Sequence, residues 1–120
     1  MDTRNAARRW AETWERGWRA GDATEILALY SDEATFRSHP FRPVVAPADY
    51  ILPTFAEEAS AECEFSEPYA VDGGRAVVEW RGETTLRDGG EEKLAGVSLL
   101  RFDANGLVVE QRDFWGAATG

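Results

Sequence analysis

The N-terminal part of the chain repeats small and aromatic residues with a helical period. Arginines and glutamates fill many of the intervening positions, and the residues that recur at steps of three and four are Ala6, Ala7, Trp10, Ala11, Trp14, Gly17 and Trp18. This pattern predicts an amphipathic helix that ends at Gly21, because glycine readily adopts the left-handed conformation of a helix C-cap. A short second helix is expected over residues 25–30, with Asp22 or Thr24 as its N-cap.

A brief strand and a third helix are predicted next. Residues 34–38 alternate in the manner of a strand, and Pro40 and Pro43 then interrupt the pattern. Residues 47–59 return to a helical spacing, but Pro53 occupies an interior position and lacks the N–H that a helix needs there. We therefore expect a kink or a restart at Pro53. The residues of this helix that are expected to face the core are Tyr50, Ile51, Thr54, Phe55 and Ala59.

The C-terminal half of the chain changes to a period of two. A first strand is predicted from Cys63 to Val71, and Pro68 marks it as an edge strand or as bulged, because proline cannot donate to a sheet ladder. Three further strands are predicted over residues 76–85, 93–103 and 107–115, separated by glycine-containing turns. Helices that come first and strands that come last indicate an α+β domain with helices on one face of an antiparallel sheet.

Size and charge restrict the domain organisation and the partners. With 120 residues and 13.3 kDa, the chain suits a single domain over residues 1–120. Its formal net charge of −9 would repel nucleic-acid phosphates and anionic membrane surfaces, so we expect no nucleic acid and no membrane as partner. No apolar run is long enough for a membrane helix, and no apolar signal core follows Met1, so we expect a cytoplasmic protein.

Cysteine and histidine are too scarce for several kinds of site. Cys63 is the single cysteine and His39 the single histidine, which excludes an intrachain disulfide and a usual zinc shell. The glutamate pairs at residues 57–58 and 91–92 are interpreted as solvated acidic faces without an inward third oxygen ligand. We expect no metal and no cofactor.

Five short segments carry a family resemblance. They are RAGD at residues 19–22, ILALYSDEATF at 26–36, SHPFR at 38–42, LRFD at 100–103 and RDFW at 112–115. Together they resemble the nuclear transport factor 2-like superfamily, and SHPFR resembles its SnoaL-like branch. The resemblance implies a cone-shaped fold, in which a curved antiparallel sheet wraps around three N-terminal helices and encloses a pocket. Because one fold hosts isomerases, dehydratases, hydrolases, cyclases and plain binders, it does not name a reaction.

The chain departs from the catalytic sets of several relatives of that superfamily. The resemblance places Trp14 at the oxyanion-hole tyrosine of ketosteroid isomerases, Ser38 at their general base and Ser98 at their second oxyanion-hole acid. Steroid isomerisation by that mechanism is therefore not expected. The Asp-Arg-Asp set of limonene epoxide hydrolase has no position-by-position match, and the paired histidines of scytalone dehydratase are reduced here to His39 alone.

The resemblance also implies which side chains line the pocket. The residues expected to bind a substrate come from the helices, the short strand and the concave sheet face, and they are Trp14, Trp18, Phe36, Ser38, Phe55, Trp80, Ser98, Gln111 and Trp115. Gly82 and Gly96 are expected to leave volume unfilled between them. Such an aromatic-lined pocket suits a small hydrophobic molecule, with a few polar groups to orient it.

Asp113 is the candidate catalytic residue with the most specific surroundings. A carboxylate between Trp14, Trp80 and Trp115 is poorly solvated, which raises its pKa toward the range useful for acid–base catalysis at neutral pH. In the alternative interpretation, Asp113 pairs with an arginine or caps a helix amide and only holds the sheet.

His39 is the second catalytic candidate, because it is expected near the pocket mouth, where it would share a proton with a substrate or with Asp113. Its alternative is a turn residue fixed by Pro40. Ser38 and Ser98 have no recognisable histidine–acid partners, so they are interpreted as donors to a ligand rather than as nucleophiles. Trp10 is interpreted as core packing.

These observations favour a cofactor-free acid/base enzyme of the SnoaL-like kind, an isomerase, cyclase, dehydratase or hydrolase acting on a small hydrophobic molecule. The alternative is a non-catalytic binding or dimerisation module of the same fold. A homodimer is predicted through the convex sheet face, because that face is too apolar to leave in water. The residues expected on it are Val77, Ala95, Val97, Leu99, Val108 and Phe114.

Overall fold

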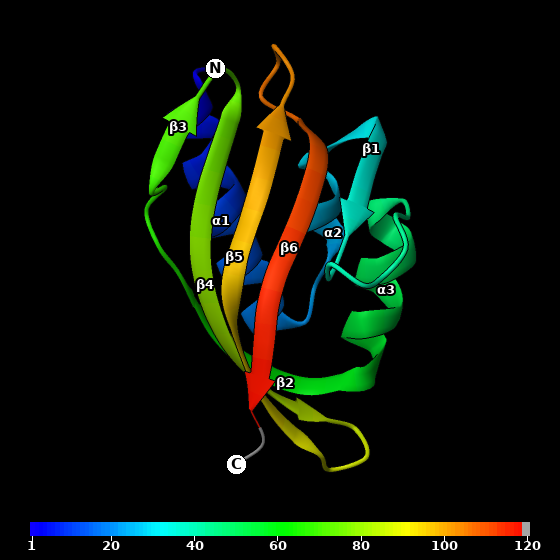
Figure 1. The fold of residues 1–120 in the computed structure, drawn as a ribbon. Coiled ribbons are helices and arrows are strands. Elements are labelled where there is room, and N and C mark those ends of the chain that lie inside the picture. Colours follow the sequence, from blue (N-terminus) through cyan, green and yellow to red (C-terminus); the bar gives the residue numbers. More distant parts are fainter. Residues whose placement is uncertain (119–120) are drawn as a thin grey trace.

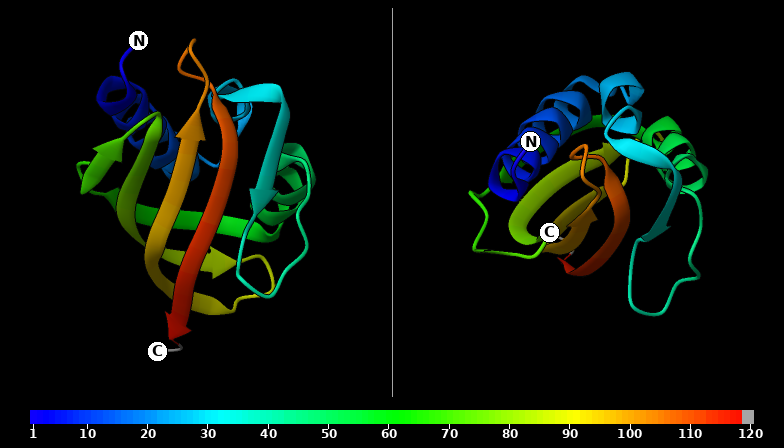
Figure 2. Two further views of the ribbon diagram at one scale, coloured as in Figure 1. Left: turned by 45° about the horizontal axis from the view of Figure 1, so that its top comes forward. Right: turned by 90° about the horizontal axis from the view of Figure 1, so that it is seen from above.

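The structure of the protein, a computed structural model, describes residues 1–118. Its elements follow the predicted order of two helices, a strand, a third helix and a run of strands (Figure 1). In chain order they are α1 (Thr3–Ala20), α2 (Thr24–Leu27), β1 (Tyr30–Arg37), α3 (Pro47–Glu57), β2 (Glu58–Phe65), β3 (Ala70–Asp72), β4 (Arg75–Leu86), β5 (Glu91–Phe102) and β6 (Val108–Ala118). The strands form a strongly curled sheet around the helices, as Figure 2 shows, and this confirms the predicted α+β cone.

The sheet is mixed, because one of its strands runs parallel to its neighbour. The strand order is β1-β6-β5-β4-β2, and β3 also pairs with β4. Antiparallel pairing joins β2, β4, β5 and β6 as predicted, whereas β1 is parallel to β6. Since β1 closes this side of the sheet, α3 lies beside it and completes the wall of the cone (Figure 1).

The long helix α1 ends at the glycine that the sequence predicts, and a side-chain cap marks its start. The side chain of Asp2 accepts a hydrogen bond from the Asn5 backbone N–H at 2.8 Å, and Gly21 caps the other end with a φ of 68°. The predicted apolar face is buried, and it carries Trp10, Trp14 and Trp18 into the concave side of the sheet. Among residues 1–118, no helix combines the length and the apolarity needed to span a membrane.

The second helix is shorter than predicted. It ends at Leu27, and Tyr30, which was expected at the end of this helix, is the first residue of β1. The Val108 backbone N–H donates to the Leu29 carbonyl at 2.8 Å, and Tyr30 pairs with Val108. Pairing with β6 therefore outweighs the helical pattern of this segment.

The third helix runs through Pro53 without a restart, so that alternative was wrong, whereas a kink at Pro53 stays a prediction. Pro53 is exposed, as is Ala59, which was predicted to face the core. Ala59 lies outside the helix because Glu58 already pairs with Leu86 as the first residue of β2. Tyr50 and Phe55 pack against the core as expected.

The strand predicted from Cys63 to Val71 is two strands. β2 ends at Phe65 and β3 begins at Ala70, and both pair with β4. Pro68 lies in the connection between them, which confirms that it marks the edge of the sheet.

A bulge near the start of β6 changes which side chains face inward. Val108 was predicted on the convex face, but it is fully buried in the core. The register shifts so that Phe102 pairs with Val108 while Arg101 pairs with Glu110. Val109 is the extra residue, and one extra residue reverses the alternation of side chains between the two faces. From Gln111 onward the predicted alternation is confirmed, with Gln111 and Asp113 both buried on the concave side.

Candidate active site

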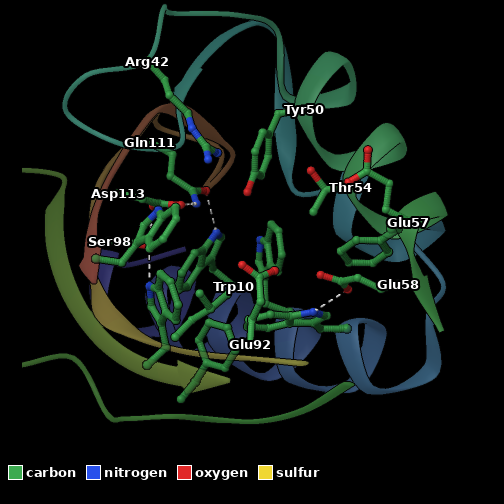
Figure 3. Close-up of a pocket in the computed structure, with 17 residues that line it drawn as sticks. Trp10, Arg42, Tyr50, Thr54, Glu57, Glu58, Glu92, Ser98, Gln111 and Asp113 are labelled. Carbon is green, nitrogen blue, oxygen red and sulfur yellow. Dashed lines mark hydrogen bonds between the residues drawn. The ribbon is translucent and has the colours of Figure 1, made fainter. Parts of the chain in front are cut away.

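A cavity of about 180 Å³ lies between the concave face of the sheet, α1 and α3 (Figure 3). Its apolar wall is mostly aromatic and consists of Trp10, Trp14, Trp18, Tyr50, Phe55, Phe65, Trp80, Leu94 and Trp115. Its polar wall consists of Arg42, Thr54, Glu57, Glu58, Glu92, Ser98, Gln111 and Asp113. The elements that meet here are far apart in the chain, so the cavity exists only in the folded protein.

Most of the predicted substrate-binding residues are brought together in this wall. They are Trp14, Trp18, Phe55, Trp80, Ser98, Gln111 and Trp115, and the candidate catalytic residue Asp113 lies among them. Phe36 does not line the cavity, since it is fully buried behind it and stacks on Tyr50 with ring centroids 5.2 Å apart.

Ser38 and His39 also lie outside the cavity wall. The Ser38 carbonyl accepts a hydrogen bond from the Trp115 indole, and its hydroxyl accepts one from Arg42. His39 packs edge to face on Trp115 with ring centroids 5.0 Å apart, and its Nδ1 accepts the Phe41 N–H at 3.3 Å. The structure thus gives His39 the contacts of a turn residue and does not place it on the wall with Asp113.

Asp113 is buried on the cavity wall, with 8% of its surface exposed. Its Oδ1 accepts hydrogen bonds from Ser98 Oγ at 2.6 Å and from Gln111 Nε2 at 3.0 Å, whereas Oδ2 accepts only a longer one, at 3.3 Å, from the same Gln111 nitrogen. Within residues 1–118, no lysine, arginine or histidine forms a salt bridge with it. Burial raises the pKa of Asp113 to about 7, although the bonds from Ser98 and Gln111 act in the opposite direction.

Two chains of hydrogen bonds end at this carboxylate. In the shorter chain, Trp80 Nε1 donates to Ser98 Oγ at 3.0 Å, and Ser98 donates to Asp113. In the longer one, the Tyr30 hydroxyl donates to Gln111 Oε1 at 2.5 Å, and the Gln111 amide nitrogen donates to Asp113. Both chains deliver a donor to Oδ1, so Oδ2 is the oxygen with capacity left for a ligand.

The indole groups set the direction of both chains. Trp14 Nε1 donates to the Tyr30 hydroxyl at 3.0 Å, and Trp10 Nε1 donates to Gln111 Oε1 at 3.1 Å. An indole nitrogen can only donate a hydrogen bond, so the Tyr30 hydroxyl accepts from Trp14. Its own O–H then donates to Gln111. The Gln111 oxygen is thereby fixed as the acceptor, and its amide nitrogen must face Asp113. Trp10, which was predicted to be core packing, is therefore also part of the cavity wall and of this network.

A second carboxyl group, that of Glu58, lies on the opposite side of the cavity (Figure 3). The interpretation of residues 57–58 as a solvated face is wrong for Glu58, which is half-buried and accepts a hydrogen bond from Trp18 Nε1 at 2.9 Å. Burial and the neighbouring charges of Glu92 and Glu57 raise its pKa, against the effect of Trp18. Within residues 1–118, no three acidic, histidine or cysteine side chains are grouped as ligands for a metal ion.

The two glycines of the concave face do not leave the space that was expected. A Cβ on Gly82 would collide with the outer edge of the Trp18 ring, and a Cβ on Gly96 would collide with Trp115 and with the Phe114 carbonyl. The glycines therefore make room for tryptophans of the cavity wall rather than for a ligand.

Several wall residues were missed as site residues by the sequence reasoning. Arg42 lies in the connection between β1 and α3, and Tyr50 and Thr54 were assigned only to the core-facing side of α3. The available signal for Tyr50 and Thr54 was their spacing, which places both on the same face of the helix. Nothing in the sequence indicates that the loop turns Arg42 back over that face.

The fold and the cavity define a nuclear transport factor 2-like α+β domain. The chain belongs to the SnoaL-like domain family, whose model matches residues 7–111. The match ends before Asp113, so the role of Asp113 rests on the geometry of the site.

Solved structures show the same architecture. The chain is similar to the epoxide hydrolase/cyclase-like enzyme SalBIII, described for pyran ring formation in polyether salinomycin, with a TM-score of 0.82, 21% identity and coverage of 99% of this chain and 98% of that one. It is also similar to an NTF2-like protein of unknown function from Exiguobacterium sp. 255-15, with a TM-score of 0.74, 15% identity and coverage of 92% and 98%. No curated protein sequence matches the chain. At these identities the likeness concerns the fold alone.

Proposed function

We propose that the protein is a cofactor-free acid/base enzyme that acts on a small hydrophobic molecule, with Asp113 as the group that moves the proton. The observation that carries the proposal is a buried carboxyl group, without a cationic partner in residues 1–118, on the wall of an aromatic cavity. With its pKa at about 7, the protonated and ionised forms of Asp113 coexist at neutral pH. The same group can therefore accept a proton and return it.

The surroundings assign a task to each neighbour of Asp113. Ser98 and Gln111 hold Oδ1 and leave Oδ2 to exchange the proton. The tryptophans bind the apolar body of the substrate and exclude water, which would otherwise stabilise the ionised carboxylate. Isomerisation, cyclisation, dehydration and hydration share this proton transfer. The likeness to SalBIII, a cyclase-like enzyme, supports a reaction of this group.

The proposal is tested with 5-nitrobenzisoxazole, a small aromatic probe whose ring opens when a base removes one proton. The C–H proton passes to the base, the N–O bond breaks, and the product is a coloured phenolate. We expect the protein to accelerate this reaction, with a rate that falls as the pH drops below about 7 and Asp113 becomes protonated. Asp113→Asn keeps the shape of the side chain but cannot take the proton, so the rate should fall by about 10²–10⁴-fold.

The matched control is Asp32→Asn, the same chemical change at an exposed position of β1. It should leave the rate and its pH profile unchanged. A rate that survives Asp113→Asn, or a profile without an inflection near pH 7, would contradict the proposal and favour a protein that binds small molecules without catalysis.

A further inference from the structure

The mechanism above does not use Tyr50 and Arg42, two polar side chains that line the same cavity as Asp113. Tyr50 projects from α3, and Arg42 projects from the connection between β1 and α3. In Figure 3 the Tyr50 hydroxyl and the Arg42 guanidinium point into the same part of the cavity as Asp113. A substrate bound against Asp113 therefore meets these two donors.

The Arg42 guanidinium is held by aromatic rings rather than by an acid. Its central carbon lies 5.3 Å from the ring centroid of Trp115 and 6.0 Å from that of Tyr50. It donates a hydrogen bond to Ser38 Oγ at 3.2 Å, and within residues 1–118 it forms no salt bridge. A guanidinium has five N–H donors and is always charged, so several donors remain for a ligand.

The Tyr50 hydroxyl remains a donor at neutral pH. Its ring is fixed by stacking on Phe36, which is fully buried. Burial raises the pKa of Tyr50, and the charge of Asp113 acts in the same direction, whereas Thr54 and Arg42 oppose them. The hydroxyl therefore keeps its proton while Asp113 titrates.

We infer that Tyr50 and Arg42 bind the substrate oxygen on which negative charge develops when Asp113 removes a proton, an inference that rests on the proposed function. The substrate class is then a hydrophobic molecule that carries a carbonyl or an epoxide oxygen. A C–H or O–H bond of the substrate breaks, and its proton goes to Asp113 Oδ2. When a C–H bond breaks, its electron pair forms a C=C bond, and the π electrons of the carbonyl move onto its oxygen as an enolate. When an O–H bond breaks, its oxygen forms a new C–O bond to an epoxide carbon, and the epoxide C–O bond breaks to leave an alkoxide on the acceptor oxygen. Asp113 then returns the proton to the product, and no oxidant or reductant is needed.

The arrangement favours this assignment because groups of complementary chemistry line one cavity. Asp113 accepts a proton, whereas Tyr50 and Arg42 present a neutral O–H and a cation to the oxygen that becomes negative. Donors that are already in place stabilise such charge without reorganisation, which is the basis of oxyanion holes. Within residues 1–118 Arg42 forms no salt bridge with Asp113, and such a pair would lower the pKa of the base.

The test measures the binding of para-nitrophenol, whose ionised form alone absorbs in the visible, to the Asp113→Asn protein. In this background the Asp113 carboxylate no longer repels the phenolate, and the result does not depend on whether Asp113 is a base. We expect the phenolate to bind more tightly than the neutral phenol, so that binding lowers the apparent pKa of the probe. Quenching of tryptophan fluorescence reports occupancy of the cavity.

Tyr50→Phe and Arg42→Gln should each weaken phenolate binding by about 10-fold or more, because each variant loses a hydrogen bond to a charged group. Binding of the neutral phenol should stay nearly unchanged. The matched controls are Tyr69→Phe and Arg16→Gln, because Tyr69 is 69% exposed and Arg16 lies on the outer face of α1. Both should bind the phenolate like the parent.

Equal affinity for the phenol and the phenolate, or phenolate binding that survives both Tyr50→Phe and Arg42→Gln, would overturn the inference. The two proposals fail separately. If Asp113 is not a base, the benzisoxazole reaction fails while selective phenolate binding persists. If Tyr50 and Arg42 do not bind the oxygen, the benzisoxazole reaction persists while selective phenolate binding is absent.

Discussion

Asp113 is more costly to ionise inside the folded protein than in the unfolded chain. Its pKa rises from an ordinary value of 3.8 to about 7. Ser98 and Gln111 donate hydrogen bonds to it, and its charge raises the pKa of Tyr30 and of Tyr50. Between these values the folded state binds more protons than the unfolded state, so the contribution of Asp113 to stability falls as the pH rises. It is fully present below about pH 4 and is lost by about pH 7. At about 1.4 kcal/mol per pKa unit, the loss is about 4 kcal/mol.

Asp113→Asn should therefore stabilise the protein above about pH 7 and have little effect below about pH 4. The amide oxygen accepts the bonds from Ser98 and Gln111, and the neutral side chain carries no desolvation cost. A gain of about 2–4 kcal/mol in the free energy of unfolding is expected at high pH. Thermal unfolding of both proteins across this range measures it, since the other carboxyl groups contribute equally to both. A variant that unfolds more easily at neutral pH would indicate a structural role for Asp113.

Among the elements, α1 and β4 fit together at one close contact. Gly82 of β4 lies under the Trp18 ring of α1, and a Cβ at this position has no space. Gly82→Ala should push Trp18 into the cavity and destabilise the protein by about 1–3 kcal/mol, the usual cost of overfilling a packed core. Urea unfolding measures this change.

Gly116→Ala is the control for Gly82→Ala, because a Cβ at Gly116 of β6 meets nothing within 4 Å. The control should be neutral. If Gly82→Ala proved equally neutral, Trp18 would not be fixed by this contact, and its place in the cavity wall would need to be revised.

The elements also show what the sequence can predict and what it cannot. The period of two from Gln111 to Trp115 correctly places Asp113 on the concave face, because side chains in an uninterrupted strand alternate. The same reasoning fails for Val108, because the bulge at Val109 leaves no signature in the residues themselves. Helix pattern alone likewise misplaced Tyr30, whose pairing with β6 depends on a partner far along the chain.

The part of the site that the sheet carries was predicted, whereas the residues on α3 and on the loop before it were missed. Ser98, Gln111 and Asp113 follow from strand parity once the resemblance to a cone-shaped fold supplies the direction of the concave face. Arg42 belongs to the cavity only because the connection after β1 folds back over α3, a tertiary property that no local pattern encodes.

At the scale of the whole molecule, the convex face of the sheet remains partly apolar. Val77 pairs with Leu99, and Val97 pairs with Phe114, so the four side chains form a patch across three strands on the face opposite the cavity. None of the four is fully buried in the single chain. An apolar patch across a sheet is a common site of self-association, and two-fold pairing is the simplest closed arrangement.

We therefore expect a homodimer through this face, with twice the chain mass of 13.3 kDa by light scattering at micromolar concentration. Leu99→Glu places a charge at the centre of the patch, where burial against a second copy would leave it unpaired. The dissociation constant of the dimer should therefore rise at least tenfold. The same change at Leu52, an exposed leucine of α3 away from the sheet, should leave the mass unchanged. A wild-type protein that is already monomeric at this concentration would refute the dimer. Because the cavity opens on the concave side, the Leu99→Glu monomer should still bind para-nitrophenol.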